Sequence, residues 1–206
     1  MSAGRSSATR GRRRRRSPEV AEQEIIDAAE ALLRERPFRE LTVDEVMRRT
    51  DLSRPSFYVY FRDRHHLVLK VVERLSAESA AGADIWYQAE GSGREVIREA
   101  TAAVVDVFVR HGAVMQALAD AAADDLEVEA AYRGTLEFFV ESTARHIERE
   151  VEAGNMLPCN VWETARALSI MNQRYLTAVL GRHPVAEPEV VIDTITTIWV
   201  RTLYGG

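Results

Sequence analysis

The sequence predicts an all-α protein with an N-terminal three-helix unit that ends in a helix-turn-helix, followed by a C-terminal helical bundle, about nine helices in total. After Ser17, apolar residues recur at three- and four-residue spacing over most of the chain, which is the period of a helix. Helix-start signals, in which Ser, Thr or Asn precedes Pro or Glu by one to three residues, divide this pattern into segments. A chain of 206 residues that is 46% hydrophobic can bury a sizeable core.

The first two helices are marked by their start signals. Pro18 suits a first helical turn, because the amide hydrogen it lacks would have no intrahelical partner, and the preceding serine can cap it. Apolar residues at helical spacing follow until Pro37, which ends the helix. Thr42 and Glu45 then form a capping box, so a second, short helix follows.

Residues 52–61, LSRPSFYVYF, allow two interpretations. Four aromatic side chains in five positions favour a strand by propensity. Ser53, however, can cap a helix, and Pro55 is tolerated in a first turn. We therefore predict a third helix, joined to the second by a tight turn, which is the helix-turn-helix arrangement of DNA-binding proteins.

The aromatic side chains of this third helix are predicted to divide between core and surface. Phe57 and Phe61 share one helical face and are expected to anchor the helix. A core position would also suit Tyr58 and Tyr60, but we favour DNA contact, because the remaining face must reach phosphates and base edges. The DNA contacts predicted on this helix are Arg54, Ser56, Tyr58 and Tyr60.

Charge is unevenly distributed along the chain, whose formal net charge is −5. Residues 1–72 carry sixteen Lys and Arg against eleven Asp and Glu, whereas the remainder carries eleven against twenty-one. The basic end therefore suits a polyanion. Its extreme, RGRRRRR at residues 10–16, is expected to be disordered when free and to lie along phosphates through Arg12, Arg13 and Arg14; a solvated tail is the alternative.

Six further helical segments are expected after the helix-turn-helix. The first should bridge the two halves of the molecule, and a linker of small residues, EGSG, follows it. Glycines are expected to end several of them. The segments run from Arg64 to Gly82, from Val96 to Gly112, around 114–118, from Val128 to Gly154, from Asn160 onwards and from Pro188 onwards.

Two polar residues lie on apolar faces of the predicted bundle. Asn172 shares a helical stripe with Leu168, and Thr143 shares one with Phe139. Buried polar groups need hydrogen-bond partners. Either these side chains satisfy each other or a backbone carbonyl, or they contact a ligand.

Several classes of function are not supported. There is no uninterrupted apolar stretch of about 18 residues and no apolar segment after the N-terminal arginines, so neither a spanning helix nor a signal peptide is predicted, and a cytoplasmic location is expected. Cys159 is the single cysteine, so no internal disulfide can form, and neither a metal site nor a cofactor is predicted. No histidine lies at a recognisable offset from Cys159, so we do not predict an enzyme.

The block TVDEVMRRTDLSRPSFYVYFRDRHHL, residues 42–67, resembles the DNA-binding signature of the TetR family of transcriptional repressors. The resemblance implies additional DNA contacts from Thr42 and Ser53. Where the family has glycine in the turn, this chain has Asp51, a residue type that can visit the left-handed region at modest cost. Where the family has Ser-Lys at the start of its fourth helix, this chain has an aspartate and Arg64, so Arg64 is expected to make the phosphate contact.

Two distant segments, ALSIMNQRYL and DTITTIWVRTLYG, resemble the effector-binding part of mycobacterial members of this family. The resemblance implies a ligand pocket in the C-terminal bundle. One asparagine of that pocket is replaced here by Ser169, and two tryptophans are replaced by Tyr132 and Phe139, so the ligand itself does not carry over. The residues implied to contact a ligand are Ile97, Ala100, Val104, Phe108, Tyr132, Phe139, Thr143, Ser169, Asn172 and Trp199.

The sequence thus predicts a ligand-responsive transcriptional regulator, a repressor that binds a near-palindromic DNA operator as a homodimer and is released by a small apolar effector. The last two long helices are expected to form the dimer, because they carry more apolar residues than one face needs. These residues are Met171, Leu176, Val179, Val191, Ile195 and Ile198. The alternative is a helical interaction module or nonspecific nucleic-acid-binding protein without an effector. The predicted domains are a disordered basic arm at 1–16, a helix-turn-helix domain at 17–66, and a ligand-binding and dimerisation domain at 67–206.

Overall fold

The computed structural model describes residues 17–88, 93–181 and 183–205. Within these ranges the chain forms eight α-helices and one short 3₁₀ helix and contains no strand, which confirms the all-α prediction. The elements are α1 (Pro18–Glu35), η1 (Phe38–Glu40), α2 (Val43–Arg48), α3 (Arg54–Tyr60), α4 (Arg64–Tyr87), α5 (Arg94–Ala122), α6 (Leu126–Glu152), α7 (Val161–Leu180) and α8 (Pro188–Tyr204). The predicted arm at 1–16, with Arg12, Arg13 and Arg14, lies outside the described residues.

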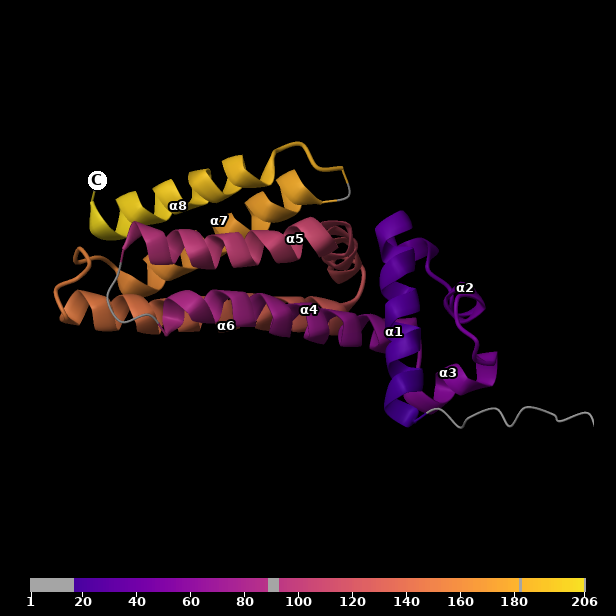
Figure 1. Cartoon of the computed structure of the whole chain (residues 1–206). Coiled ribbons are helices and arrows are strands. Elements are labelled where there is room, and N and C mark those ends of the chain that lie inside the picture. Colours follow the sequence, from indigo (N-terminus) through magenta and orange to yellow (C-terminus); the bar gives the residue numbers. More distant parts are fainter. Residues whose placement is uncertain (1–16, 89–92, 182, 206) are drawn as a thin grey trace, which may run out of the picture.

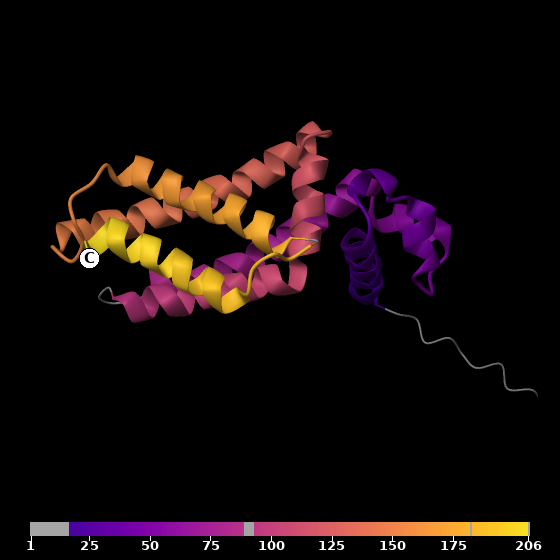
Figure 2. The same cartoon turned by 90° about the horizontal axis from the view of Figure 1, so that it is seen from above.

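The helices form two groups joined by one long helix. Helices α1, α2 and α3 lie together at one end, and α5 to α8 form a bundle at the other (Figure 1). Helix α4 starts immediately after α3 and continues along the bundle (Figure 1). Helices α7 and α8 lie side by side on one flank of the bundle, as the view from above also shows (Figure 2).

The predicted start signals act as caps. The Ser17 hydroxyl accepts from the amide of Val20 at 3.4 Å, which leaves Pro18 in the first turn of α1. Thr42 accepts from the amide of Glu45 at 3.3 Å and donates to its carboxylate at 2.7 Å. Ser53 differs, because its hydroxyl makes no capping hydrogen bond and lies 2.9 Å from the hydroxyl of Ser56. Two of these three hydroxyls therefore satisfy backbone donors that a helix start leaves free.

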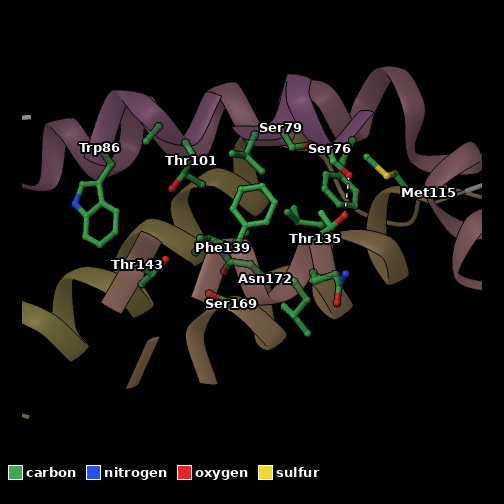
Figure 3. A pocket seen from close by; sticks show the side chains of 18 of the residues that line it. Ser76, Ser79, Trp86, Thr101, Met115, Thr135, Phe139, Thr143, Ser169 and Asn172 are labelled. Carbon is green, nitrogen blue, oxygen red and sulfur yellow. Dashed lines mark hydrogen bonds between the residues drawn. The ribbon is translucent and has the colours of Figure 1, made fainter. Parts of the chain in front are cut away.

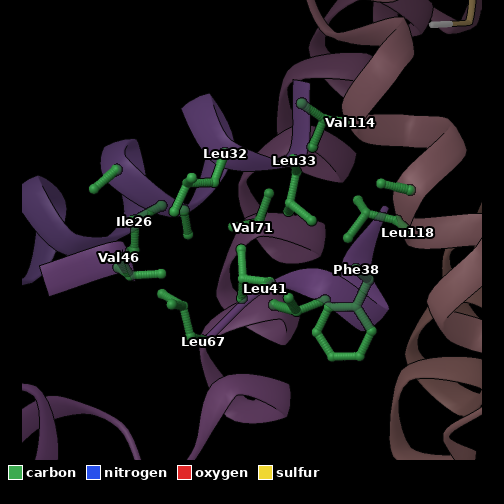
Figure 4. Packing of buried hydrophobic residues seen from close by; sticks show 14 of the residues in the cluster. Ile26, Leu32, Leu33, Phe38, Leu41, Val46, Leu67, Val71, Val114 and Leu118 are labelled. Atoms are coloured by element: carbon green, nitrogen blue, oxygen red, sulfur yellow. The ribbon is translucent and has the colours of Figure 1, made fainter. Parts of the chain in front are cut away.

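The first hydrophobic core holds the helix-turn-helix together and extends beyond it. Phe57 and Phe61 are completely buried in it, as predicted for the anchors of α3. The core includes the first half of α4 and the end of α5 around Leu118 (Figure 4). It also includes Val128 at the start of α6. The predicted domain boundary at residue 66 falls in the first turn of α4 and remains a prediction.

The helix ends predicted at Gly82 and Gly112 are wrong. Both glycines lie inside helices, at positions where a neighbouring helix packs closely. Helix α5 runs through Gly112 to Ala122, so the separate piece predicted at 114–118 is part of it, and the described chain has eight α-helices rather than about nine. A Cβ atom on Gly112 would lie 1.8 Å from the carbonyl oxygen of Leu180. Helix α4 likewise continues through Gly82, where a Cβ would approach the Cβ of Ala103 to 3.3 Å. Both glycines therefore allow neighbouring helices to approach closely.

Helix α5 is long and apolar enough over one 18-residue window to match a membrane-spanning helix in composition. In this fold it is the central helix of the bundle, with Ile97, Val105 and Phe108 buried in the second hydrophobic core. The same core includes Trp86 of α4 and Trp199 of α8. A central helix of a bundle is apolar on several faces because its neighbours cover them.

Candidate functional site

A cavity lies inside the second core, surrounded by five helices (Figure 3). Its volume is about 140 Å³, measured as the space open to the centre of a water-sized sphere. On that measure a single water needs roughly 10–15 Å³, so the cavity exceeds the space of one trapped water. Its walls are mostly apolar, with a few polar groups that point inwards, which is the usual composition of a small-molecule site.

All ten residues predicted to contact a ligand line this cavity. They come from four helices far apart in the sequence, α5, α6, α7 and α8. The prediction missed the fifth wall, which α4 provides. The lining residues of α4 are Val72, Ser76, Ser79, Ala83, Trp86 and Tyr87. Their spacing of three and four residues indicates one helical face, but the assumed helix end at Gly82 concealed its second half.

Asn172 is held in place by a tryptophan. The indole Nε1 of Trp199 donates to the Asn172 Oδ1 at 3.1 Å, which joins α8 to α7 across the cavity wall. An asparagine side chain has one acceptor oxygen and two amide donors. With its oxygen engaged by the indole, Asn172 offers the cavity amide donors in particular. A ligand acceptor such as a carbonyl oxygen can therefore bind to these amide donors.

Thr143 forms a second polar contact at the wall. Its hydroxyl lies 3.3 Å from the phenol of Tyr87, which joins α6 to α4. Burial raises the pKa of Tyr87 to about 12, while the hydrogen bond from Thr143 acts in the opposite direction. Burial also raises the pKa of Tyr132. Both phenols are therefore neutral near pH 7, and the walls carry hydroxyl groups rather than charges.

A third polar contact joins α4 to α6 at another part of the cavity. The hydroxyls of Ser76 and Thr135 lie 2.9 Å apart (Figure 3), and Thr135 donates its proton to the carbonyl of Ala131 at 3.1 Å. Since a hydroxyl has one proton, Ser76 donates to Thr135. The cavity wall therefore contains two hydrogen bonds from α4 to α6, and these two helices also contact the helix-turn-helix.

The predicted DNA contacts occupy the opposite end of the molecule. Thr42, Ser53, Arg54 and Tyr58 are exposed, and Tyr58 keeps 55% of its surface. Arg54 is paired with Asp44 of α2, with Nε 2.9 Å from Oδ1. Ser56 is half-buried, and Tyr60 is half-buried against the first core. Of the two tyrosines, Tyr58 is therefore the better placed to reach a base or a phosphate.

Arg64 is engaged within the protein. Its Nη1 donates to the carbonyl of Leu41 at 3.0 Å, and its guanidinium lies 4.8 Å from the ring centroid of Phe38. These contacts stabilise the segment that links η1 to α2. A phosphate contact from this side chain would have to share the guanidinium with Leu41, and it remains a prediction.

Two exposed residues of this surface were not anticipated from the sequence. Val59 is 75% exposed, and Arg62, which follows α3 in the chain, has a side chain that is 63% exposed. In the sequence, Val59 gives no sign of a function, because it is an apolar residue between two tyrosines. Its position relative to the anchors could have revealed it, since it is two residues from both Phe57 and Phe61 and so projects away from the core.

An ion pair and a close histidine–carboxylate contact connect this surface to the start of α6. The Nη2 of Arg62 lies 2.8 Å from the Oε2 of Glu127, and the Nε2 of His65 lies 3.5 Å from the Oδ2 of Asp125. Glu127 belongs to the helix that contributes Thr135, Phe139 and Thr143 to the cavity. The segment that follows α3 is therefore linked to a cavity helix as well as to α4.

A buried carboxylate fixes α1 against the bundle. Glu30 of α1 is 4% exposed and pairs with Arg34 of its own helix, with Arg74 of α4 and with His111 of α5, whose Nδ1 lies 2.6 Å from the Glu30 Oε1. Burial lowers the pKa of His111, opposed by the nearby carboxylate of Glu78. One acidic side chain thus connects three helices where the two halves of the molecule meet.

Two family models match the chain. Residues 25–71 match the model described as bacterial regulatory proteins, tetR family, and residues 97–205 match the model described as transcriptional regulator EthR, C-terminal domain. The first covers most of α1, all of α2 and α3, and the start of α4. The second covers most of α5 and all of α6, α7 and α8, and hence four of the five cavity walls.

Full-length relatives agree with these matches. The chain is 31% identical to the HTH-type transcriptional regulator EthR of Mycobacterium tuberculosis over 98% of this chain and 96% of that protein. It is 29% identical to the HTH-type transcriptional regulator EthR of Mycolicibacterium smegmatis over 98% of this chain and 95% of that protein. The fold resembles that of PfmR, a TetR family transcriptional regulator from Thermus thermophilus, with a TM-score of 0.72 at 14% identity, covering 86% of this chain and 97% of PfmR. The chain therefore belongs to the TetR family of transcriptional regulators and has a C-terminal domain of the EthR type.

Proposed function

We propose that this regulator is a cytoplasmic repressor that binds a near-palindromic operator as a homodimer and leaves it when an apolar small molecule enters the cavity. The observation that carries the proposal is the course of α4. This helix begins one turn after the recognition helix α3, and its second half forms a wall of the cavity. A ligand that displaces this wall displaces the recognition helix with it.

The polar groups of the cavity define the proposed ligand. Most of the wall is aliphatic or aromatic, and Asn172 presents amide donors because Trp199 occupies its oxygen. We therefore propose an uncharged, mainly apolar ligand with a carbonyl or similar acceptor placed at Asn172. Its contacts are proposed to be the ten predicted lining residues together with the α4 face around Ser79 and Trp86.

The proposed dimer uses the exposed faces of α7 and α8. Three apolar residues of these helices that the sequence favoured for dimer contact, Leu176, Val191 and Ile195, are instead buried within the chain. Exposed apolar side chains of the same helices are the better candidates for the interface, and Ile198 among them was also predicted from the sequence. They are Trp162, Ile170, Val190 and Ile198. A two-fold dimer would present two α3 helices to two half-sites one helical turn of DNA apart.

The test is selection of bound duplexes from a random pool by the full-length chain. We expect a single enriched sequence with two inverted half-sites. Unrelated DNA should bind at least about a thousandfold more weakly than this sequence, which is the lower end of the ratio for specific regulators. Enrichment without any shared sequence would support the alternative, a nonspecific nucleic-acid-binding protein. A single half-site without symmetry would contradict the dimer and leave the DNA-binding assignment in place.

A further inference from the structure

The recognition helix α3 carries an apolar side chain where the sequence led us to expect polar groups. Val59 is 75% exposed, the highest value among the large apolar residues of the helix-turn-helix. At about 100° per residue, a position two residues from Phe57 and two from Phe61 lies almost opposite both. Those two phenylalanines are fully buried, so Val59 projects straight out of the protein at the centre of the exposed face.

The side chains around Val59 restrict what it can contact. Pro55, one turn earlier, is also exposed, and Tyr58 keeps 55% of its surface. An arginine lies at each end of the segment from Arg54 to Arg62, and each forms an ion pair with an acidic residue. Arg54 pairs with Asp44, and Arg62 pairs with Glu127. The middle of the face therefore offers apolar and aromatic surface, with the cations at its margins.

We infer that Val59 reads the 5-methyl group of a thymine in each operator half-site. The inference rests on the proposed operator binding, in which α3 enters the major groove. Valine has no donor or acceptor in its side chain, so it cannot read the hydrogen-bonding edge of a base. The 5-methyl group of thymine is the apolar feature of the major groove, and apolar side chains distinguish thymine by contacting it. A single exposed valine at the tip of the molecule is too small for a protein interface, which buries about 800 Å² on each partner.

The test removes only that methyl group. In the operator obtained by selection, each thymine is replaced in turn by uracil, which keeps every hydrogen-bonding group of the base pair. At one thymine in each half-site, we expect uracil to weaken binding of the unaltered protein by about fourfold, the ratio for burying one methyl-sized group. Val59→Ala should show a smaller preference for thymine at that position, because its single methyl group reaches less far toward the base.

A matched control separates this contact from a general effect of the substitution. Val109 lies on an exposed face of α5 with 50% of its surface accessible, away from α3. Val109→Ala should keep the full preference for thymine. Because Val59 is exposed, its replacement should leave the melting temperature unchanged, so a loss of binding would not reflect unfolding.

Two results would overturn the inference while operator binding stands. The first is an operator in which no thymine is sensitive to uracil, and the second is a Val59→Ala variant that prefers thymine at the sensitive position as strongly as the unaltered protein does. If selection yields no specific site, the proposed function fails and this inference fails with it. The two failures are therefore distinguishable.

Discussion

His146 shows how one side chain can make stability depend on pH. It is 1% exposed, its ring centroid lies 4.0 Å from that of Trp86, and its Nε2 has no hydrogen-bond partner among the described residues. Burial lowers the pKa of His146, and the positive charge of Arg149 lowers it further. The carbonyl of Tyr87 and the carboxylate of Glu150 raise this pKa, but their effect is smaller than that of burial. The folded protein therefore keeps this imidazole neutral at a pH where a free histidine begins to take up a proton.

The sign of the resulting pH dependence follows from the lowered pKa. In the unfolded chain this histidine titrates near pH 6.5, whereas in the folded protein it titrates lower, so the unfolded state binds more protons as the pH falls below about 6.5. Stability is thus complete above this value and declines below it. We expect the melting temperature to fall between pH 7.5 and pH 5.5, and to fall less in His146→Leu. Equal losses of melting temperature in both proteins would mean that other groups cause the effect. The control is His183→Gln, at an exposed position, which should lose as much as the unaltered protein.

At the scale of elements, helix packing depends on positions where a side chain has no room. Gly112 lies inside α5 against the C-terminal end of α7, where an added Cβ would meet the Leu180 carbonyl at 1.8 Å and its carbon at 2.8 Å. Backbone atoms cannot move aside as a flexible side chain can. The contact between α5 and α7 therefore requires glycine here, although glycine is unfavourable in a helix interior.

Two alanine substitutions separate packing from helix propensity. Gly112→Ala should destabilise the protein by about 1–3 kcal/mol or more, because the two helices must separate. Gly134→Ala, on an exposed face of α6 where a Cβ would meet nothing within 4 Å, should stabilise it by up to about 1 kcal/mol. Urea unfolding of both variants gives the comparison. A Gly112→Ala variant as stable as the unaltered protein would show that α5 and α7 are less tightly packed than the structure indicates.

At the scale of the whole molecule, the proposed switch requires the cavity and the DNA-binding surface to be coupled. Helix α4 is one connection, and the pair of Arg62 with Glu127 provides a second through α6. Both side chains of this pair are more than half exposed, so the pair contributes little to stability. Its contribution would lie in the orientation of the recognition helix relative to α6.

Glu127→Ala tests the second connection, and because it also frees Arg62 beside the DNA-facing surface, operator affinity is compared with and without ligand in the same variant. We expect a melting temperature close to that of the unaltered protein and a smaller effect of ligand on operator affinity, which in coupled systems is typically about 5- to 150-fold. The probe is a long-chain alkyl amide, checked for cavity binding by quenching of Trp86 and Trp199 fluorescence. Glu141→Ala, which breaks an exposed pair with Arg145 on the same helix, is the control and should leave the coupling intact. An unchanged ligand effect in Glu127→Ala would assign the coupling to α4.

Reciprocity gives an independent check on the same measurements. If the alkyl amide weakens operator binding by a given factor, the operator must weaken amide binding by that factor. The equality holds for any path of coupling, so a violation would indicate that the amide also binds elsewhere. Agreement of the two factors in the unaltered protein and in the Glu127→Ala variant would show that the residual coupling is real.

Much of this protein follows from local sequence signals. The capping side chains of Ser17, Thr42 and Asn160 satisfy donors within a few residues of themselves, so the helix starts could be predicted without the fold. The anchors Phe57 and Phe61 follow from helical periodicity alone. The ten cavity residues were named from resemblance to relatives, and chain spacing could not have brought four helices together.

The tertiary structure decided what depends on neighbours distant in sequence. Gly82 and Gly112 resemble helix ends in the sequence, yet the approach of Ala103 and of Leu180 makes them packing positions inside long helices. The sequence could not predict the α4 wall of the cavity or the hydrogen bond from Arg64 to the Leu41 carbonyl, because both depend on residues that are distant in the chain. A helix start is fixed by contacts within one turn, whereas a wall, a buried ion pair or an exposed valine is defined by what the folded chain places beside it.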